Sequence, residues 1–287
     1  MAACSPQAPA PTLTPSSVLS GPAVIDDLAF TSGDVTLVGR LTLPAGEGPF
    51  PAVVWVHGSG QTTRDEASPL HDMLVAAGVA VFSYDKRGVG ESGGNYSEVV
   101  VGQGNRVLGQ LAADAAAATD FVATQEQINA AHIGFFGASQ AGWVIPQAAL
   151  LTENVSYVAL LSGPTVSVGI ENYYSRITPN QGGSVTLEQV ETFSQQLSRV
   201  QSNGYDPREA IAALEIPGLW ILGARDASIP VRETVAILEE INDTLRRDFT
   251  VFIYPNANHG MFDAESGIQE PFMTEVLIPW IYETIQR

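Results

Sequence analysis

The chain has 287 residues, of which 45% are hydrophobic and 15% charged, as expected for a globular protein with a large core. Its formal net charge is −18, and Lys86 is the only lysine. So acidic a surface repels phosphate backbones and argues against nucleic acid as a partner, and no apolar run is long enough to span a bilayer.

The first 22 residues are predicted to form a flexible tail, because the stretch to about Ser20 is rich in Pro, Ala, Thr and Ser. Cys4, the only cysteine, follows Ala2 and Ala3 and resembles the lipidated cysteine at the cleavage site of a bacterial lipoprotein. That resemblance implies an exported protein with a lipid anchor at Cys4, although the apolar segment expected before the cysteine is missing. The alternative is a disordered tail with one incidental thiol on a cytoplasmic protein.

Strands and helices are predicted to alternate through residues 23–164. The first two strands flank a Thr-Ser-Gly-Asp turn at residues 31–34, which is typical of a hairpin. Continuous apolar runs then indicate strands that are covered on both faces. The strands are expected at residues 24–30, 35–43, 52–56, 79–84, 133–136 and 157–161, and the helices at 68–77, 108–125 and after Ser139.

The alternation stops at Pro164 and resumes after residue 213. Thr186 with Gln189 three residues on is a capping-box pattern, and Asp206-Pro207 is typical of a second helix start. We therefore predict that residues 165–213 are a small helical insertion, which would lie over the active-site end as a cap. Further strands are expected at 219–222 and 249–254, and helices at 231–245 and 271–285.

This pattern predicts an α/β protein with a mostly parallel sheet and helices on both faces. Ligands of such sheets bind outside the carboxyl ends of the strands, and four loops lie there. These loops contain His57 to Gly60, Ser139, Asp226 and His259. Small residues at positions 137 and 141 flank Ser139, as a sharp strand-to-helix turn requires.

The motifs at these loops resemble the α/β-hydrolase superfamily, over about residues 23–287. Within it, the chain is most similar to bacterial esterases and serine aminopeptidases, including the catalytic domain of prolyl-oligopeptidase relatives. The resemblance implies a hydrolase core made of residues 23–164 and 214–287, with Ser, Asp and His in that chain order. The matching motifs are His-Gly-Ser-Gly at 57–60, Asp-Lys-Arg-Gly-Val-Gly-Glu-Ser at 85–92, the turn at Ser139, Gly-Ala-Arg-Asp at 223–226 and Asn-His-Gly at 258–260.

The resemblance implies a serine hydrolase acting on a small carboxylic ester through an acyl-enzyme on Ser139. His259 would be the base, and Asp226 would orient it. The backbone N–H groups of Gln140 and Ser59 would bind the oxyanion, with Gly60 as the alternative donor or a substrate contact. Asp243, Asp248 and Asp263 are other acids, but only Asp226 ends a predicted strand in the required order.

The remaining motif residues have structural explanations. His57 is expected to hold its loop by hydrogen bonding, and residues 85–92 are expected to be architectural, with Arg87 tying a turn. Tyr173, Tyr174 and Phe193 are candidates for lining an acyl or alcohol pocket; equally, they could pack the cap onto the core.

No cofactor is expected, and the four histidines lack metal-site spacing. The sequence leaves open a serine peptidase or aminopeptidase, a thioesterase, and a binding protein on a hydrolase scaffold. It carries no signal for the oligomeric state.

Overall fold

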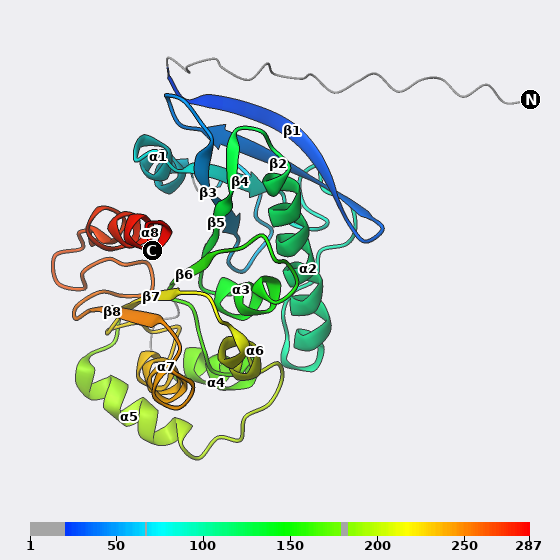
Figure 1. The fold of residues 1–287 in the computed structure, drawn as a ribbon. Coiled ribbons are helices and arrows are strands. Elements are labelled where there is room, and N and C mark those ends of the chain that lie inside the picture. Colours follow the sequence, from blue (N-terminus) through cyan, green and yellow to red (C-terminus); the bar gives the residue numbers. More distant parts are fainter. Residues whose placement is uncertain (1–20, 67, 179–182) are drawn as a thin grey trace, which may run out of the picture.

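The computed structural model describes residues 21–66, 68–178 and 183–287 (Figure 1). Its strands form one sheet in the order β1-β2-β4-β3-β5-β6-β7-β8. β2 pairs antiparallel with β1 and β4, and every other neighbouring pair is parallel, which confirms the predicted sheet type. The strands are β1 (Ala23–Ser32), β2 (Val35–Leu43), β3 (Phe50–Val56), β4 (Ala80–Tyr84), β5 (Ile128–Ala138), β6 (Tyr157–Leu161), β7 (Gly218–Gly223) and β8 (Phe249–Tyr254).

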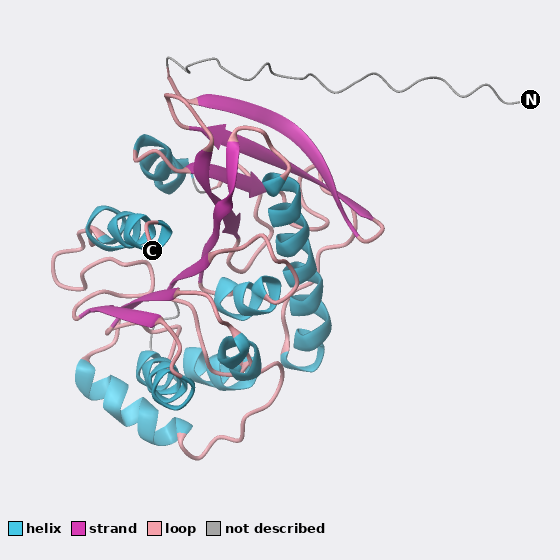
Figure 2. Ribbon diagram, in the orientation of Figure 1, coloured by secondary structure: helices cyan, strands magenta, loops and turns pink. Residues whose placement is uncertain are grey.

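Helices cover both faces of this sheet (Figure 2). Figure 1 shows α1 and α8 on one side and α2 and α3 on the other. None of the helices in the described ranges is long and apolar enough to cross a membrane. The helices are α1 (Ser68–Ala76), the 3-10 turn η1 (Val101–Gln103), α2 (Gly104–Ala123), α3 (Ala141–Ala149), α4 (Val168–Ile177), α5 (Leu187–Leu197), α6 (Arg208–Ala213), α7 (Val231–Leu245), the π-helical turn η2 (Met273–Leu277) and α8 (Ile278–Ile285).

The core consists of two apolar layers, one on each face of the sheet. Side chains alternate between the faces of a strand, so Val54 of β3 packs in one layer and its neighbours Val53 and Trp55 pack in the other. α2 and α3 cover the first layer, whereas α1 and α8 cover the second. Because both faces are covered, the central strands read as continuous apolar runs.

Two elements differ most from their sequence-based prediction. β5 begins at Ile128, five residues before the predicted start, because Phe50 of β3 pairs with Ile128 across a register shift. α4 was not predicted at all. Its start is marked by Ser167, whose hydroxyl accepts a hydrogen bond from the Ile170 N–H at 3.4 Å, a signal that the sequence does contain.

α4, α5 and α6 follow β6 in the chain and precede β7, where the helical insertion was predicted. The predicted capping box is present at the start of α5, with Thr186 and Gln189 each bonding the backbone of the other. The insertion is tied to the loop after β7, since the Tyr174 hydroxyl donates to the Asp226 carbonyl at 2.9 Å. Cys4 lies outside the described residues, so the lipid anchor stays a prediction.

Candidate active site

Ser139 occupies a strained turn between β5 and α3. Its φ of 55° lies in the left-handed region, which is uncommon for a non-glycine residue. The Ser139 N–H donates to the Leu161 carbonyl at 2.9 Å, which anchors the turn to the end of β6. A Cβ on Gly137 would lie 2.6 Å from the Cβ of Ala141, so the structure confirms that both flanking residues must be small.

Asp226 follows β7 and is held on three sides. One carboxylate oxygen, Oδ1, accepts the N–H groups of Ser228 and Ile229 at 2.7 and 2.9 Å. The other, Oδ2, lies 2.8 Å from Nδ1 of His259, which follows β8. Asp226 is only 1% exposed, so its carboxylate can orient the His259 ring without competition from water.

The backbone at His259 is held by the same strand end that anchors Ser139. The hydroxyl of Ser162, the residue after Leu161, donates to the His259 carbonyl at 2.9 Å. Ser162 itself has a φ of 49°, so this contact depends on a second strained residue. Ser139 and His259 are thus both anchored at the end of β6, although no hydrogen bond joins their side chains among the described residues.

The electrostatic surroundings of His259 favour its charged form. Burial by itself would lower the pKa of His259, but Asp226 opposes this through its charge and its hydrogen bond. A second carboxylate, Glu171 of α4, acts in the same direction, and the net effect is a raised pKa. An imidazole in this position is a stronger base than one in water.

A cavity of about 140 Å³ opens beside Ser139. Ser59 and Gln140 line it together with Ser139, so the structure brings together these three predicted residues. Its other wall is formed by the insertion and neighbouring loops. The remaining lining residues are Val99, Trp143, Pro164, Val168, Glu171, Asn172 and Ile229.

The three insertion aromatics proposed from the sequence do not line this cavity. Tyr174 is 1% exposed, bonds the Asp226 backbone and packs edge-on against Phe193 with ring centroids 6.1 Å apart. Tyr174 and Phe193 therefore pack the insertion together and onto the core, which corrects the pocket prediction in favour of its alternative. Tyr173 and Gly60 are likewise absent from the lining.

Lys86 holds the loop that contains Ser59, a role that the sequence analysis missed. Its buried ammonium donates to the carbonyls of Gly58 and Gly60 at 2.5 and 3.1 Å, and to Oε1 of Gln140 at 3.2 Å. Burial lowers the pKa of Lys86 to about 8. The signal in the sequence was the presence of a single lysine, directly after the fourth strand.

The direction of one peptide group follows from this contact. In a trans peptide the C=O and the next N–H point in opposite directions. Holding the Gly58 carbonyl on Lys86 therefore turns the Ser59 N–H away from the lysine. His57 holds the same loop as expected, with Nε2 lying 2.5 Å from the Tyr84 carbonyl, and burial lowers its pKa to about 4.

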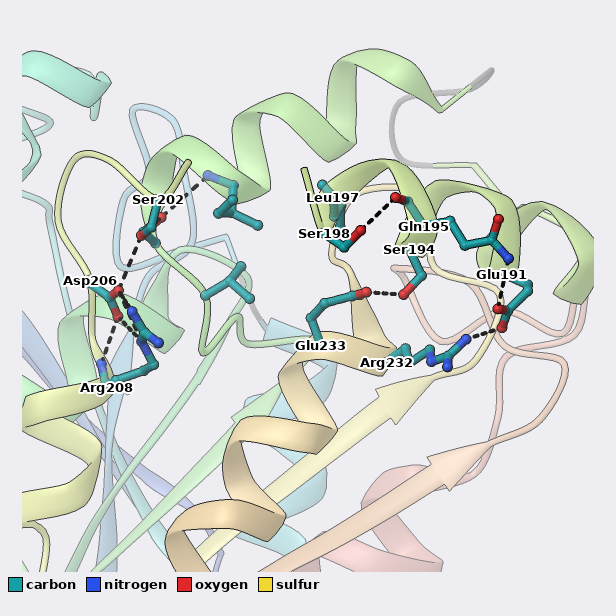
Figure 3. A pocket seen from close by; sticks show the side chains of 13 residues that line it. Glu191, Ser194, Gln195, Leu197, Ser198, Ser202, Asp206, Arg208, Arg232 and Glu233 are labelled. Atoms are coloured by element: carbon teal, nitrogen blue, oxygen red, sulfur yellow. Dashed lines mark hydrogen bonds and ion pairs between the residues drawn. The ribbon is translucent and has the colours of Figure 1, made fainter. Parts of the chain in front are cut away.

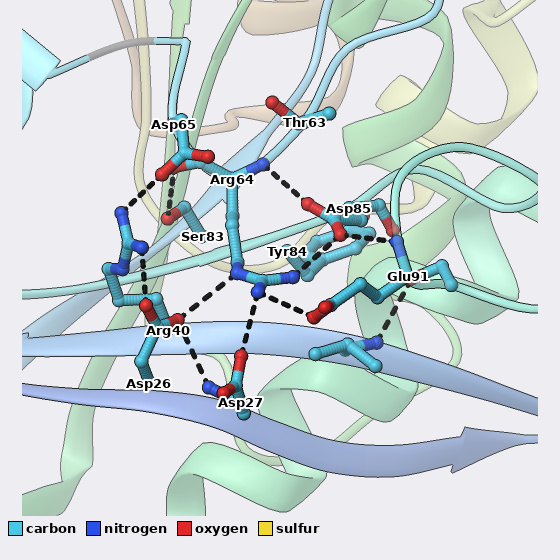
Figure 4. Close-up of polar contacts among 12 residues, drawn as sticks. Asp26, Asp27, Arg40, Thr63, Arg64, Asp65, Ser83, Tyr84, Asp85 and Glu91 are labelled. Carbon is cyan, nitrogen blue, oxygen red and sulfur yellow. Dashed lines mark hydrogen bonds and ion pairs between the residues drawn. The ribbon is translucent and has the colours of Figure 1, made fainter.

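A second set of charges lies behind this loop and is called the Arg64 cluster (Figure 4). The Arg64 guanidinium donates to Asp85 at 2.6 Å and to three further carboxylates. It joins the loop after β3 to the loop after β4 and to β1. Its other partners are Glu91 at 2.7 Å, Asp27 at 2.8 Å and Asp26 at 3.1 Å.

A larger cavity, of about 410 Å³, lies between the insertion and the start of α7 (Figure 3). Its charged side chains are already paired: Arg232 with Glu191, Ser194 with Glu233, and Arg208 with Asp206. None of Ser139, Asp226 and His259 lines it. Size therefore does not identify the reactive site, and the 140 Å³ cavity is the candidate. Across the described residues, no group of three or more His, Cys, Asp or Glu side chains is arranged to hold a metal.

Comparisons with known proteins identify relatives of this chain in sequence and in fold. Esterase EstD of Thermotoga maritima is 24% identical over 271 residues, which cover 85% of this chain but only 63% of that protein. The chain therefore spans less than two thirds of this curated relative's length.

Two solved esterase structures match this chain over a larger share of both proteins. The esterase Pf2001 of Pyrococcus furiosus matches with a TM-score of 0.63 and 18% identity, over 96% of this chain and 97% of that one. An acetyl xylan esterase from Paenibacillus sp. R4 gives a TM-score of 0.61 and 20% identity, over 95% and 87%. These matches confirm the α/β-hydrolase fold. Residues 68–276 match the prolyl oligopeptidase family, and the chain belongs to that family.

Proposed function

We propose that this protein is a serine hydrolase that cleaves carboxylic esters through an acyl-enzyme on Ser139. The observation that carries the proposal is the strained turn at Ser139 on the same strand end that anchors His259, itself bonded to the buried Asp226. The esterases similar to this chain in sequence and fold support the same reaction class.

Ser139 attacks the ester carbonyl while Nε2 of His259 takes the hydroxyl proton. Asp226 keeps the proton of His259 on Nδ1, so that Nε2 is free to accept, and stabilises the imidazolium that forms. The imidazolium then protonates the departing alcohol. In the second step of the reaction, deacylation, His259 removes a proton from water. The water attacks the acyl-enzyme and releases the acid.

The oxyanion is bound by the N–H groups of Ser59 and Gln140. Both residues line the cavity with Ser139, and neither N–H has an acceptor among the described residues. Ser59 lines the cavity and Gly60 does not, which favours Ser59 over Gly60 as the donor. Lys86 supports both donors, since it bonds the Gly58 carbonyl and the Gln140 side chain.

The test is hydrolysis of a short-chain aryl ester by Ser139→Ala. The turnover number should fall by about 10⁴-fold or more, because the variant lacks the nucleophile. Ser198→Ala, which removes a hydroxyl from the exposed end of α5, is the matched control and should keep wild-type turnover. Undiminished hydrolysis by Ser139→Ala would refute the assignment.

Membership of the prolyl oligopeptidase family favours one second candidate, cleavage of peptide amides. Esters and amides pass through the same oxyanion, so the site geometry alone does not separate them. Aryl esters, thioesters and aminoacyl anilides with matched acyl groups should be compared by kcat/KM. We expect the highest value for the ester; a higher value for the anilide would make the protein a peptidase.

A further inference from the structure

One carboxylate in the cavity beside Ser139, which we call the catalytic cavity, has no bonded partner among the described residues. Glu171 lies in the first turn of α4 and lines the cavity beside Ser139. Its side chain is partly buried and forms no hydrogen bond or ion pair with the described residues. Other buried carboxylates are paired: Asp85 with Arg64, Asp114 with Arg87, and Asp226 with His259.

The environment of Glu171 disfavours its negative charge. Burial raises the pKa of Glu171 to about 7, the negative charge of Asp226 adds to this, and His259 opposes it. His259 and Asp226 are the titratable groups that act on it from the loops packed against α4. An unpaired carboxylate in such a place costs stability, and such groups are concentrated at functional sites.

The other walls of the cavity suit a cation. Trp143 and Asn172 line it with Glu171, and aromatic rings and carbonyl oxygens both attract ammonium groups. None of the residues lining it is cationic, and the nearby Lys86 is committed to three hydrogen bonds. The net charge of −18 also draws cations towards the protein.

We propose that Glu171 forms a subsite for a positively charged nitrogen on the ester substrate. The subsite rests on the proposed ester hydrolysis at Ser139, because it selects among substrates of that reaction. When the cation enters the cavity, it pairs with the Glu171 carboxylate. The two opposite charges are then desolvated as an ion pair. A neutral substrate of the same shape leaves Glu171 unpaired.

The test compares pairs of substrates that differ only by replacement of N⁺ by carbon. One pair carries the charge on the acyl part: 4-nitrophenyl 4-(trimethylammonio)butanoate and 4-nitrophenyl 5,5-dimethylhexanoate. The other carries it on the leaving group: acetylthiocholine and 3,3-dimethylbutyl thioacetate. In at least one pair, kcat/KM should be at least about tenfold higher for the cation, and Glu171→Gln should remove this preference.

The pH dependence of that preference gives an independent readout. Glu171 ionises as the pH rises through about 7, so the cation-to-neutral ratio of kcat/KM should rise over the same range and be flat in Glu171→Gln. The titration of His259 cancels in this ratio, because both substrates need the neutral imidazole. With the neutral ester alone, the acidic limb of Glu171→Gln should move to lower pH, since Glu171 raises the pKa of His259.

The control is Glu188→Gln, which removes one negative charge from the exposed surface of α5. It should keep the wild-type preference. A wild-type ratio near one in both pairs, or an equal loss of both esters in Glu171→Gln, would overturn the subsite and leave Glu171 acting only through His259. Ser139→Ala keeps the two proposals apart, because it should abolish turnover of every substrate whether or not the preference exists.

Discussion

The Arg64 cluster and the cavity beside Ser139 both hold carboxylates that are shielded from water, but the two regions pair these charges differently. In the Arg64 cluster one guanidinium contacts four carboxylates. Glu171 lines the cavity and has no bonded partner among the described residues, where the side chain of His259, which does not line the cavity, bonds only Asp226. Paired charges hold loops together, whereas a charge left unpaired beside the proposed nucleophile is available to a substrate.

The two regions are joined by consecutive residues after β4. Asp85 faces Arg64, and Lys86 faces the loop at Ser59. One turn therefore connects the structural ion pairs to the proposed oxyanion donors. Variants on either side of this turn should separate effects on stability from effects on catalysis.

Asp226→Asn should have the largest effect. The asparagine keeps an oxygen for the N–H groups of Ser228 and Ile229, but it cannot stabilise the His259 imidazolium. We expect kcat for an aryl ester to fall by about 10⁴-fold, with a smaller effect on thermal stability. A variant with lowered thermal stability and an unchanged kcat would show that Asp226 stabilises the fold, as the Arg64 cluster does, and does not act in catalysis.

Arg64→Met should chiefly affect stability. Asp85, whose side chain is 3% exposed, would lose its cation, whereas the exposed Asp27 and Glu91 would contribute little. We expect the free energy of unfolding to fall by about 3 kcal/mol in denaturant titrations.

The control for Arg64 is Arg208→Met, which breaks the more exposed pair with Asp206 and should cost less than about 0.5 kcal/mol. Equal losses in the two variants would mean that the Arg64 cluster is no more structural than a surface ion pair.

Lys86→Met should have the smallest effect of the three, and on catalysis. The Gly58 peptide would lose its anchor, so kcat should fall about 10- to 100-fold with little change in KM. Affinity for a boronic acid that mimics the tetrahedral intermediate should fall in parallel, whereas affinity for the product acid should not.

The pH profile distinguishes this positioning role from simple loss of structure. Lys86 is charged below its pKa of about 8, so wild-type kcat should decline as the pH rises through that value. Lys86→Met should lack this alkaline limb, and Lys86→Arg should recover part of the activity. A wild-type kcat in Lys86→Met would show that the loop holds its shape without the lysine.

Local patterns in the sequence were sufficient to predict the fold class and to place Ser139, Asp226 and His259 in loops that follow strands of the sheet. Apolar runs and turn residues depend on neighbours a few positions away, and the carboxyl ends of parallel strands necessarily share an edge. The bonded pair of His259 and Asp226 is consistent with that rule, although the two residues are 33 positions apart in the sequence.

The tertiary structure alone decided what surrounds those residues. Lys86 and Gln140 are 54 positions apart, and Tyr174 is 52 from Asp226. No periodicity indicates where a peptide carbonyl points or which side of an insertion helix meets a cavity. For that reason the sequence left open whether Tyr174 lines a pocket or packs against the core, and it gave no signal for Glu171, three positions earlier on the same helix. Contacts between distant segments determine which side chain is packed and which lines the cavity.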